Sequence, residues 1–182
     1  MNEKINNKET AILGLLSEKP MHGYDLEQAI RMRDMRYWTE ISMSSVYKVL
    51  KKLEEKKLVE AQIRMAANNV AQKVYSLTPA GGFILKEKIA ALFYGFDHHR
   101  WEIDLAISNF GVLPDSLKKE CIEVYISKLE ELHKGYGELQ KYLEAEGCPD
   151  HRLALATRPQ YLYRAELEWA RDYLKLINTK QP

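Results

Sequence analysis

A change of hydrophobic period near residue 59 constrains the fold more than any other feature of this sequence. Residues 59–65 (VEAQIRM) alternate strictly between apolar and polar, whereas the preceding segments repeat their apolar residues every three or four positions. Strict alternation is typical of a half-buried β-strand. Residues 73–78 (KVYSLT) are rich in β-formers and predict the returning strand, with a turn at residues 66–69. The sequence therefore predicts a β-hairpin set between helices.

Two short helices are predicted at the start of the chain. The first begins at Asn6, which can form a capping box with Glu9, and it ends before Pro20. The second runs over about residues 23–31, where apolar residues share one face. Both helices are short and need a common core.

The third predicted helix is capped by Ser42 or Ser44 and reaches about Lys56. Because successive helical residues lie about 100° apart, its apolar face lies opposite an exposed face with hydroxyls near the N-terminus and ammonium groups further along. A helix in the DNA major groove needs short hydroxyls for close approach and cations for phosphates or guanine edges. Taken alone, the pattern also fits a solvated surface helix.

The order of the elements favours the DNA-binding interpretation. Three helices followed by a hairpin is the winged helix-turn-helix order, in which the third helix reads the groove and the hairpin reaches the neighbouring backbone. Residues 1–82 also carry 13 lysines and arginines against 10 acidic residues, although the whole chain has a net charge of only +1. That balance excludes a uniformly basic coat but leaves room for a local basic patch. We predict a DNA-binding domain over residues 1–85.

The rest of the chain, residues 86–182, is predicted to be a helical dimerisation domain that can also sense an effector. Thr78 followed by Pro79 signals a helix start, and this helix is expected to be interrupted near Gly95. A long helix over residues 115–146 and a last helix over residues 159–178 follow.

The long helix carries an apolar stripe about 40 Å in length, which is more apolar surface than a monomer leaves exposed. It predicts a homodimer through Leu117, Cys121, Tyr125, Leu129, Leu132, Tyr136, Leu139 and Leu143. Cys121 is expected in the core.

Several segments together resemble the PadR family of bacterial transcriptional regulators. The resemblance in the front half rests on residues 11–16 (AILGLL), 22–26 (HGYDL), Trp38, 42–54 (SMSSVYKVLKKLE) and 75–81 (YSLTPAG). In the rear half, residues 104–107 (DLAI) and 165–169 (AELEW) resemble the family's helical dimerisation region.

The resemblance implies a homodimeric repressor on a pseudo-palindromic double-stranded operator, with the repression relieved by a small molecule or another signal. It places Tyr24 near the DNA and assigns the reading positions to the third helix and the hairpin. The predicted DNA-binding residues are Tyr24, Ser42, Ser44, Ser45, Tyr47, Lys48, Lys51, Lys52, Asn69, Gln72 and Lys73.

The sequence departs from the family pattern at three places. Lys48 follows Tyr47 where the family commonly has proline, and Lys57 stands where it commonly has glycine. Residues 66–73 (AANNVAQK) lack the usual glycines and arginines, so Asn69, Gln72 and Lys73 can serve the DNA backbone instead of a minor-groove arginine.

The effector is the least defined expectation. Late aromatic residues can line an apolar cavity or form a dimer core, and an arginine beside them can pair an anion. A small aromatic or anionic effector is therefore predicted near Trp101, Tyr161, Tyr163 and Arg164.

No metal site, cofactor or catalytic centre is predicted. His98 and His99 point in different directions on a helix, so they cannot ligate one ion together. The sequence has no GxSxG, P-loop or HExxH motif. A helical adaptor that does not bind DNA is the alternative function.

The expected location is the cytoplasm. The two cysteines cannot form a disulfide framework, the first residues are polar, and no apolar run approaches the length of a membrane span.

Overall fold

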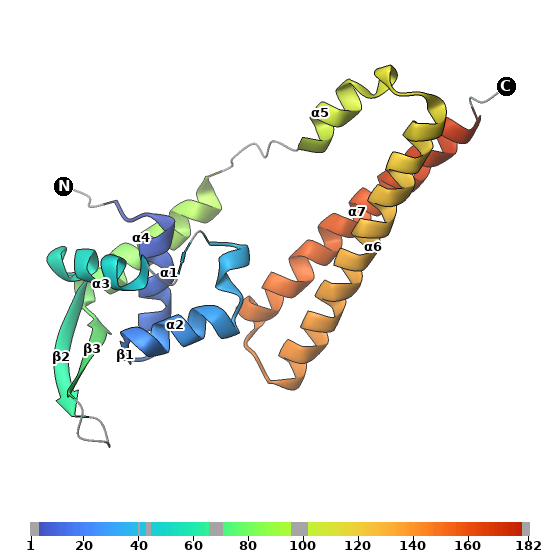
Figure 1. Ribbon diagram of the computed structural model, residues 1–182. Coiled ribbons are helices and arrows are strands. Elements are labelled where there is room, and N and C mark those ends of the chain that lie inside the picture. Colours follow the sequence, from blue (N-terminus) through green and yellow to red (C-terminus); the bar gives the residue numbers. More distant parts are fainter. Residues whose placement is uncertain (1–3, 40, 43–44, 66–70, 96–101, 180–182) are drawn as a thin grey trace. The chain divides into compact units, whose positions relative to one another are not determined.

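The computed structural model describes residues 4–39, 41–42, 45–65, 71–95 and 102–179 (Figure 1). The chain divides into two compact units, residues 1–98 and 99–182. Both units are mainly helical and the first holds a small antiparallel sheet, so the predicted fold class is confirmed. The boundary predicted between residues 85 and 86 lies within helix α4 (Pro79–Tyr94).

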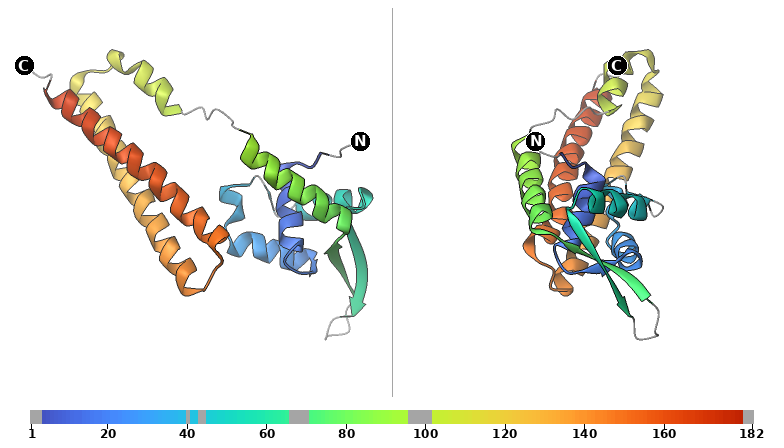
Figure 2. Two further views of the ribbon diagram at one scale, coloured as in Figure 1. Left: turned by 180° about the vertical axis from the view of Figure 1, so that it is seen from behind. Right: turned by 90° about the vertical axis from the view of Figure 1, so that its left-hand side faces the viewer.

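The first unit contains the helices and the hairpin expected from the sequence, with one additional strand. Its elements are α1 (Asn7–Leu16), β1 (Met21–His22), α2 (Gly23–Met32), the 3₁₀ turn η1 (Met35–Tyr37), α3 (Val46–Glu55), β2 (Val59–Met65), β3 (Ala71–Leu77) and α4. The β2–β3 hairpin extends away from the helices of this unit (Figure 2).

The sheet has three strands in the order β1-β3-β2, and all of its pairings are antiparallel. Strand β2 pairs with β3 from Val59 opposite Leu77 onward. Strand β1, which the sequence analysis missed, pairs Met21 with Tyr75 and so attaches the start of α2 to the base of the hairpin.

The core of the first unit lies where α1, α2 and α3 pack together. Ile12, Leu26, Leu50 and Leu53 are completely buried there. The predicted capping box at the start of α1 is confirmed, because the Glu9 N–H donates to Asn6 Oδ1 at 2.9 Å and the Asn6 N–H donates to Glu9 Oε2 at 2.8 Å.

Helix α3 begins later than predicted. Its N-cap is Ser45, which makes no side-chain capping bond, so the prediction that Ser42 caps the helix is wrong. The two serines bond to each other instead: the Ser42 N–H donates to Ser45 Oγ at 3.1 Å, and Ser45 Oγ donates to the Ser42 carbonyl at 2.7 Å. Ser44 lies outside the described residues.

Helix α3 ends in a tight reversal of the backbone at Lys57. This residue has φ +58°, the left-handed conformation that side chains disfavour. The Lys57 N–H donates to the Glu54 carbonyl and the Leu58 N–H to the Leu53 carbonyl, both at 2.9 Å. These two bonds form a Schellman motif, in which glycine usually occupies the left-handed position.

The second unit contains α5 (Glu102–Ser108), the 3₁₀ turn η3 (Phe110–Val112), α6 (Asp115–Ala145) and α7 (Asp150–Thr179). Helices α6 and α7 form an antiparallel hairpin (Figure 1). The prediction that the last helix starts at Pro159 is wrong, because α7 begins nine residues earlier and contains Pro159. Of the helices described, none is long and apolar enough to cross a membrane.

The predicted stripe on α6 divides into two faces. Leu129 is buried against α7 with Leu167 and Ala170, and Ile122, which the stripe omitted, is also buried. Three further stripe residues, Tyr125, Tyr136 and Leu143, are half-buried. The remaining four stripe residues are exposed within the chain: Leu117, Cys121, Leu132 and Leu139.

The placement of Cys121 in the core is therefore wrong for the single chain. It lies on the side of α6 that does not face α7.

Candidate nucleic-acid interface

A groove of about 630 Å³ in the first unit brings together four of the predicted DNA-binding residues. Tyr24 comes from α2, Tyr47 from α3, and Gln72 and Lys73 from β3. The remaining lining residues are His22, Gly23, Asp25 and Tyr75. Three segments that are distant in sequence thus contribute to one surface.

The glycine of the HGYDL segment allows a close approach in this groove. A Cβ atom at Gly23 would lie 2.4 Å from a ring carbon of Tyr47, which is far inside van der Waals contact. The Tyr47 ring therefore rests on the backbone at the start of α2. The side chains of Tyr47 and Tyr24 remain more than half exposed.

His22 and Asp25 line the groove although the sequence analysis did not single them out. His22 Nδ1 accepts a hydrogen bond from the Asp25 N–H at 3.3 Å and so caps α2. His22 Nε2 lies 3.2 Å from Asp25 Oδ2, and the His22 ring stacks on Tyr24 with 6.1 Å between ring centroids. The sequence feature that could have identified these two residues is their position inside the HGYDL segment.

Lys73 is the cation that the hairpin contributes. Its Nζ lies 2.8 Å from Glu54 Oε2 on α3 and 5.3 Å from the centre of the Tyr75 ring. The hydrogen bond with Glu54 raises the pKa of Lys73, so the side chain stays charged at neutral pH. This bond also joins β3 to α3.

The lysines of α3 occupy two different environments. Lys48 and Lys51 are exposed, and Lys51 Nζ lies 4.0 Å from Glu55 Oε1, one turn further on. Lys52 instead lies 3.2 Å from Glu9 Oε1 of α1. All three predicted α3 lysines are exposed, and Lys52 also reaches a carboxylate buried on another helix.

Of the other four predicted DNA-binding residues, the structure describes two. Ser42 is exposed and Ser45 is half-buried, just before α3. Ser44 and Asn69 lie outside the described residues.

Three of the four predicted effector residues lie on α7 within the described part of the chain. Arg164 stacks on Tyr161 at 4.8 Å from the ring centre, and both side chains are exposed. Tyr163 packs inward, 5.7 Å from Tyr136 of α6. Trp101 lies outside the described residues, as do His98 and His99. Elsewhere in the described ranges, no group of three metal-ligating side chains could hold an ion.

Tyr125 forms a polar contact between the long helices. Its hydroxyl donates to Glu166 Oε1 at 3.0 Å. Burial, followed by the hydrogen bond to Glu166 and nearby negative charge, raises the pKa of Tyr125 to about 12. Part of the predicted dimerisation stripe is thus already used inside the chain.

Comparisons with known proteins identify the family. Residues 12–87 match the family model described as the transcriptional regulator PadR-like family. The match contains α2, α3 and both strands of the hairpin, including every described residue of the groove. The chain belongs to the PadR-like family.

A curated protein is also similar to this chain at the sequence level. This PadR-like chain is 30% identical over 81 residues to uncharacterized protein X of Lysinibacillus sphaericus. The aligned part is 44% of this chain and 73% of the relative.

Solved structures share the fold along nearly the whole chain. Bacillus subtilis PadR in complex with operator DNA has a TM-score of 0.73 and 20% identity, covering 93% of this chain and 98% of that one. Bacillus subtilis PadR in complex with p-coumaric acid has a TM-score of 0.74 and 18% identity, covering 96% and 99%. The Vibrio cholerae virulence activator AphA has a TM-score of 0.69 and 21% identity, covering 96% and 100%.

Proposed function

We propose that this PadR-like regulator binds a pseudo-palindromic operator as a homodimer and represses the genes beside it. Helix α3 enters the major groove and the hairpin reaches the adjacent backbone. The observation that carries this proposal is the groove in which Tyr24, Tyr47, Gln72 and Lys73 meet. A protein of the same fold has been crystallised with operator DNA.

The exposed residues of the first unit have the chemistry that this role requires. Tyr47 and Lys48 follow the N-cap of α3, where side chains reach base edges in a helix-turn-helix complex. Lys51 is one turn further on and is placed for a phosphate. Lys73 supplies a cation from the hairpin.

The homodimer is supported by an exposed apolar face on the second unit. On α6 this face consists of Leu117, Leu132 and Leu139, and on α7 of Leu155, Leu162 and Leu176. The angular spacing of helical residues puts both sets on the same side of the hairpin, beside the faces that α6 and α7 bury against each other. An apolar surface of this length is a marker of protein association.

We also propose that the protein is a repressor and that a small aromatic or anionic effector relieves the repression. Both parts of this proposal come from the family resemblance. A promoter–reporter fusion tests the direction of regulation: deletion of the regulator should raise expression. A fall on deletion would instead indicate an activator, the role named for the protein AphA. Native mass spectrometry of the purified protein tests for a bound small molecule.

DNA binding is tested by fluorescence anisotropy with the duplex upstream of the protein's own gene. Affinity should fall steeply with salt, by about 0.9 log units per log unit of salt for each phosphate contacted. Lys48→Ala and Lys51→Ala should weaken binding, and Lys134→Ala, an equally exposed lysine on α6, should not. Absence of binding at low salt would favour the alternative, a helical adaptor that does not bind DNA.

A further inference from the structure

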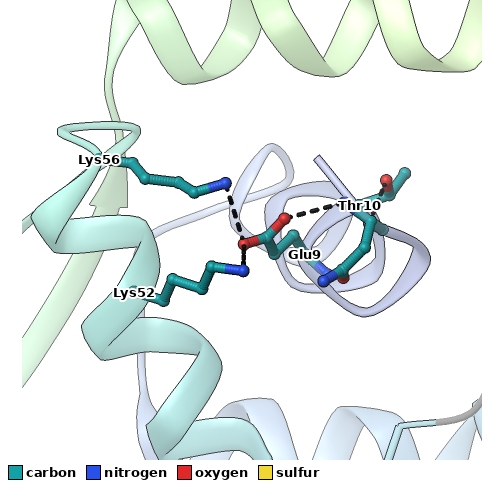
Figure 3. A network of polar contacts seen from close by, with 5 residues as sticks. Glu9, Thr10, Lys52 and Lys56 are labelled. Atoms are coloured by element: carbon teal, nitrogen blue, oxygen red, sulfur yellow. Dashed lines mark hydrogen bonds and ion pairs between the residues drawn. The ribbon is translucent and has the colours of Figure 1, made fainter. Parts of the chain in front are cut away.

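Glu9 connects the N-terminus of α1 to the last turns of α3 (Figure 3). Its side chain is 1% exposed, and its two oxygens have different partners. Oε2 accepts the capping hydrogen bond from the Asn6 N–H at 2.8 Å. Oε1 lies 3.2 Å from Lys52 Nζ, in the last turn of α3, and 3.2 Å from Nζ of Lys56, the C-cap residue of that helix.

The capping bond alone does not account for a buried charge at this position. A glutamine completes a capping box as well as a glutamate does, because only one side-chain oxygen is needed. A buried carboxylate is costly unless it is paired and hydrogen-bonded. The second oxygen and the negative charge therefore have a separate partner, which is the pair of lysines at the C-terminal end of α3.

The electrostatics of the cluster keep this carboxylate ionised. Burial by itself raises the pKa of Glu9, but the Asn6 N–H, Lys52 and Lys56 together outweigh it and leave the pKa below its usual value. Glu9 thus carries its charge at neutral pH. Lys56 is mostly buried beside it, whereas about half of the Lys52 side chain remains exposed.

The two lysines lie one turn apart at the C-terminal end of α3, Lys52 in its last turn and Lys56 at its C-cap. The residues placed to read DNA, Tyr47 and Lys48, lie in its first half. Apolar packing tolerates small rotations and sliding of a helix, but two ammonium groups on one carboxylate define a direction. Val46, Leu50 and Leu53 bury the apolar side of α3, and the two ion pairs with Glu9 add a directional contact at its C-terminal end.

We propose that Glu9 is a positioning residue for operator recognition, which holds α3 in its reading orientation through Lys52 and Lys56. Lys52 then acts through Glu9 and is not itself a DNA contact. The inference rests on the proposed function of α3 as the reading helix.

The test compares Glu9→Gln with the wild-type protein on two duplexes. One duplex is selected from a random pool by the wild-type protein, and the other is its shuffled sequence. Glu9→Gln keeps the capping box and the side-chain size but removes the charge. We expect affinity for the selected duplex to fall about tenfold, as for other coupled networks, with no loss for the shuffled duplex. A purely structural role would lower the melting temperature without changing this ratio at a temperature where the variant is folded.

Lys52→Ala separates positioning from direct contact. If Lys52 acts through Glu9, Lys52→Ala lowers the affinity for the selected duplex only, and adding Glu9→Gln causes little further loss. If Lys52 contacts a phosphate, both duplexes weaken equally and the salt slope falls by about one unit. That second result would overturn the proposal. The Lys52→Ala comparison also decides between positioning and direct contact if Glu9→Gln does not fold.

Lys48→Ala distinguishes failure of this inference from failure of the proposed function. If Lys48→Ala weakens operator binding but folded Glu9→Gln retains full selectivity, the positioning role is wrong and α3 remains the reading helix. If Lys48→Ala and Lys51→Ala together leave affinity unchanged, the proposed function fails first. Lys52→Arg keeps the positive charge that Lys52→Ala removes. If it retains the selectivity and the salt slope of the wild type, the positioning role is supported.

Discussion

Replacing Lys57 by glycine should stabilise the protein. Lys57 occupies the left-handed position of the Schellman motif that ends α3, with φ +58°. The same motif ends α6, where Gly147 has φ +63° and the N–H groups of Gly147 and Cys148 each donate at 3.0 Å. The chain therefore contains one backbone motif twice, once with a side chain in the unfavourable position and once without.

The size of the effect follows from the backbone alone. The left-handed conformation costs a residue with a Cβ about 1–2 kcal/mol. Glycine avoids that cost but loses about 0.5–1 kcal/mol more in conformational entropy on folding. The hydrogen bond that the Lys57 carbonyl accepts from Thr78 Oγ1, at 2.9 Å, is made by the backbone and is kept. The net gain should be about 0.5–1 kcal/mol, or roughly 2 °C in melting temperature for a chain of this size.

Thermal unfolding followed by circular dichroism measures this shift. Lys57→Ala is the matched control, because it removes the ammonium group and keeps the Cβ, so its melting temperature should stay near that of the wild type. Gly147→Ala is the reverse experiment and should lose about 1 kcal/mol. If Lys57→Gly is no more stable than Lys57→Ala, the strain argument is wrong.

Three further predictions address the core, the ionised cluster and the dimer. Leu50→Ala should cost about 2–5 kcal/mol in unfolding free energy because Leu50 is completely buried, whereas Lys48→Ala should change it by less than about 0.5 kcal/mol; urea denaturation measures both. Because the folded-state pKa of Glu9 is depressed, the cluster adds stability above the unfolded pKa of about 4.3 and loses it as pH falls through the lower folded value. The stability difference between wild type and Glu9→Gln should therefore be constant near neutral pH and should shrink below about pH 4.5; a difference that grows in acid would contradict this sign. Leu139→Glu should produce a monomer in light scattering, and Tyr161→Glu, on another face of the hairpin, should remain a dimer.

Local signals in the sequence were sufficient for most of the first unit. The capping box at Asn6, the alternation in β2 and the Thr78–Pro79 helix start each depend on residues within a few positions of one another. Such features are encoded by backbone preferences and short-range hydrogen bonds, so a single sequence displays them. The prediction that Tyr24, Tyr47 and Lys73 serve a common site used the family resemblance, and their meeting in one groove is visible only in three dimensions.

The features that were missed depend on distant partners. Strand β1 is only two residues long, too short to show alternation, and it exists because β3 pairs with it. Pro159 was interpreted as a helix start, but packing of α7 along α6 continues the helix through it, although proline cannot donate to the carbonyl of residue 155. The lysine partners of Glu9 lie more than forty positions away, so no spacing rule could reveal them.

The pairing of β1 with β3 also bears on when the groove lined by Tyr24, Tyr47 and Lys73 can form during folding. Met21 and Tyr75 are more than fifty positions apart, and closing so long a loop must precede any gain from their contact. Helices α1 to α3 consist of local contacts and can form early. His22 and Tyr24 meet Gln72 and Lys73 only when this strand pair closes. A nascent chain that has not yet emerged beyond β3 therefore carries α3 without the completed groove, and under the proposed function it would lack part of the surface that meets the operator.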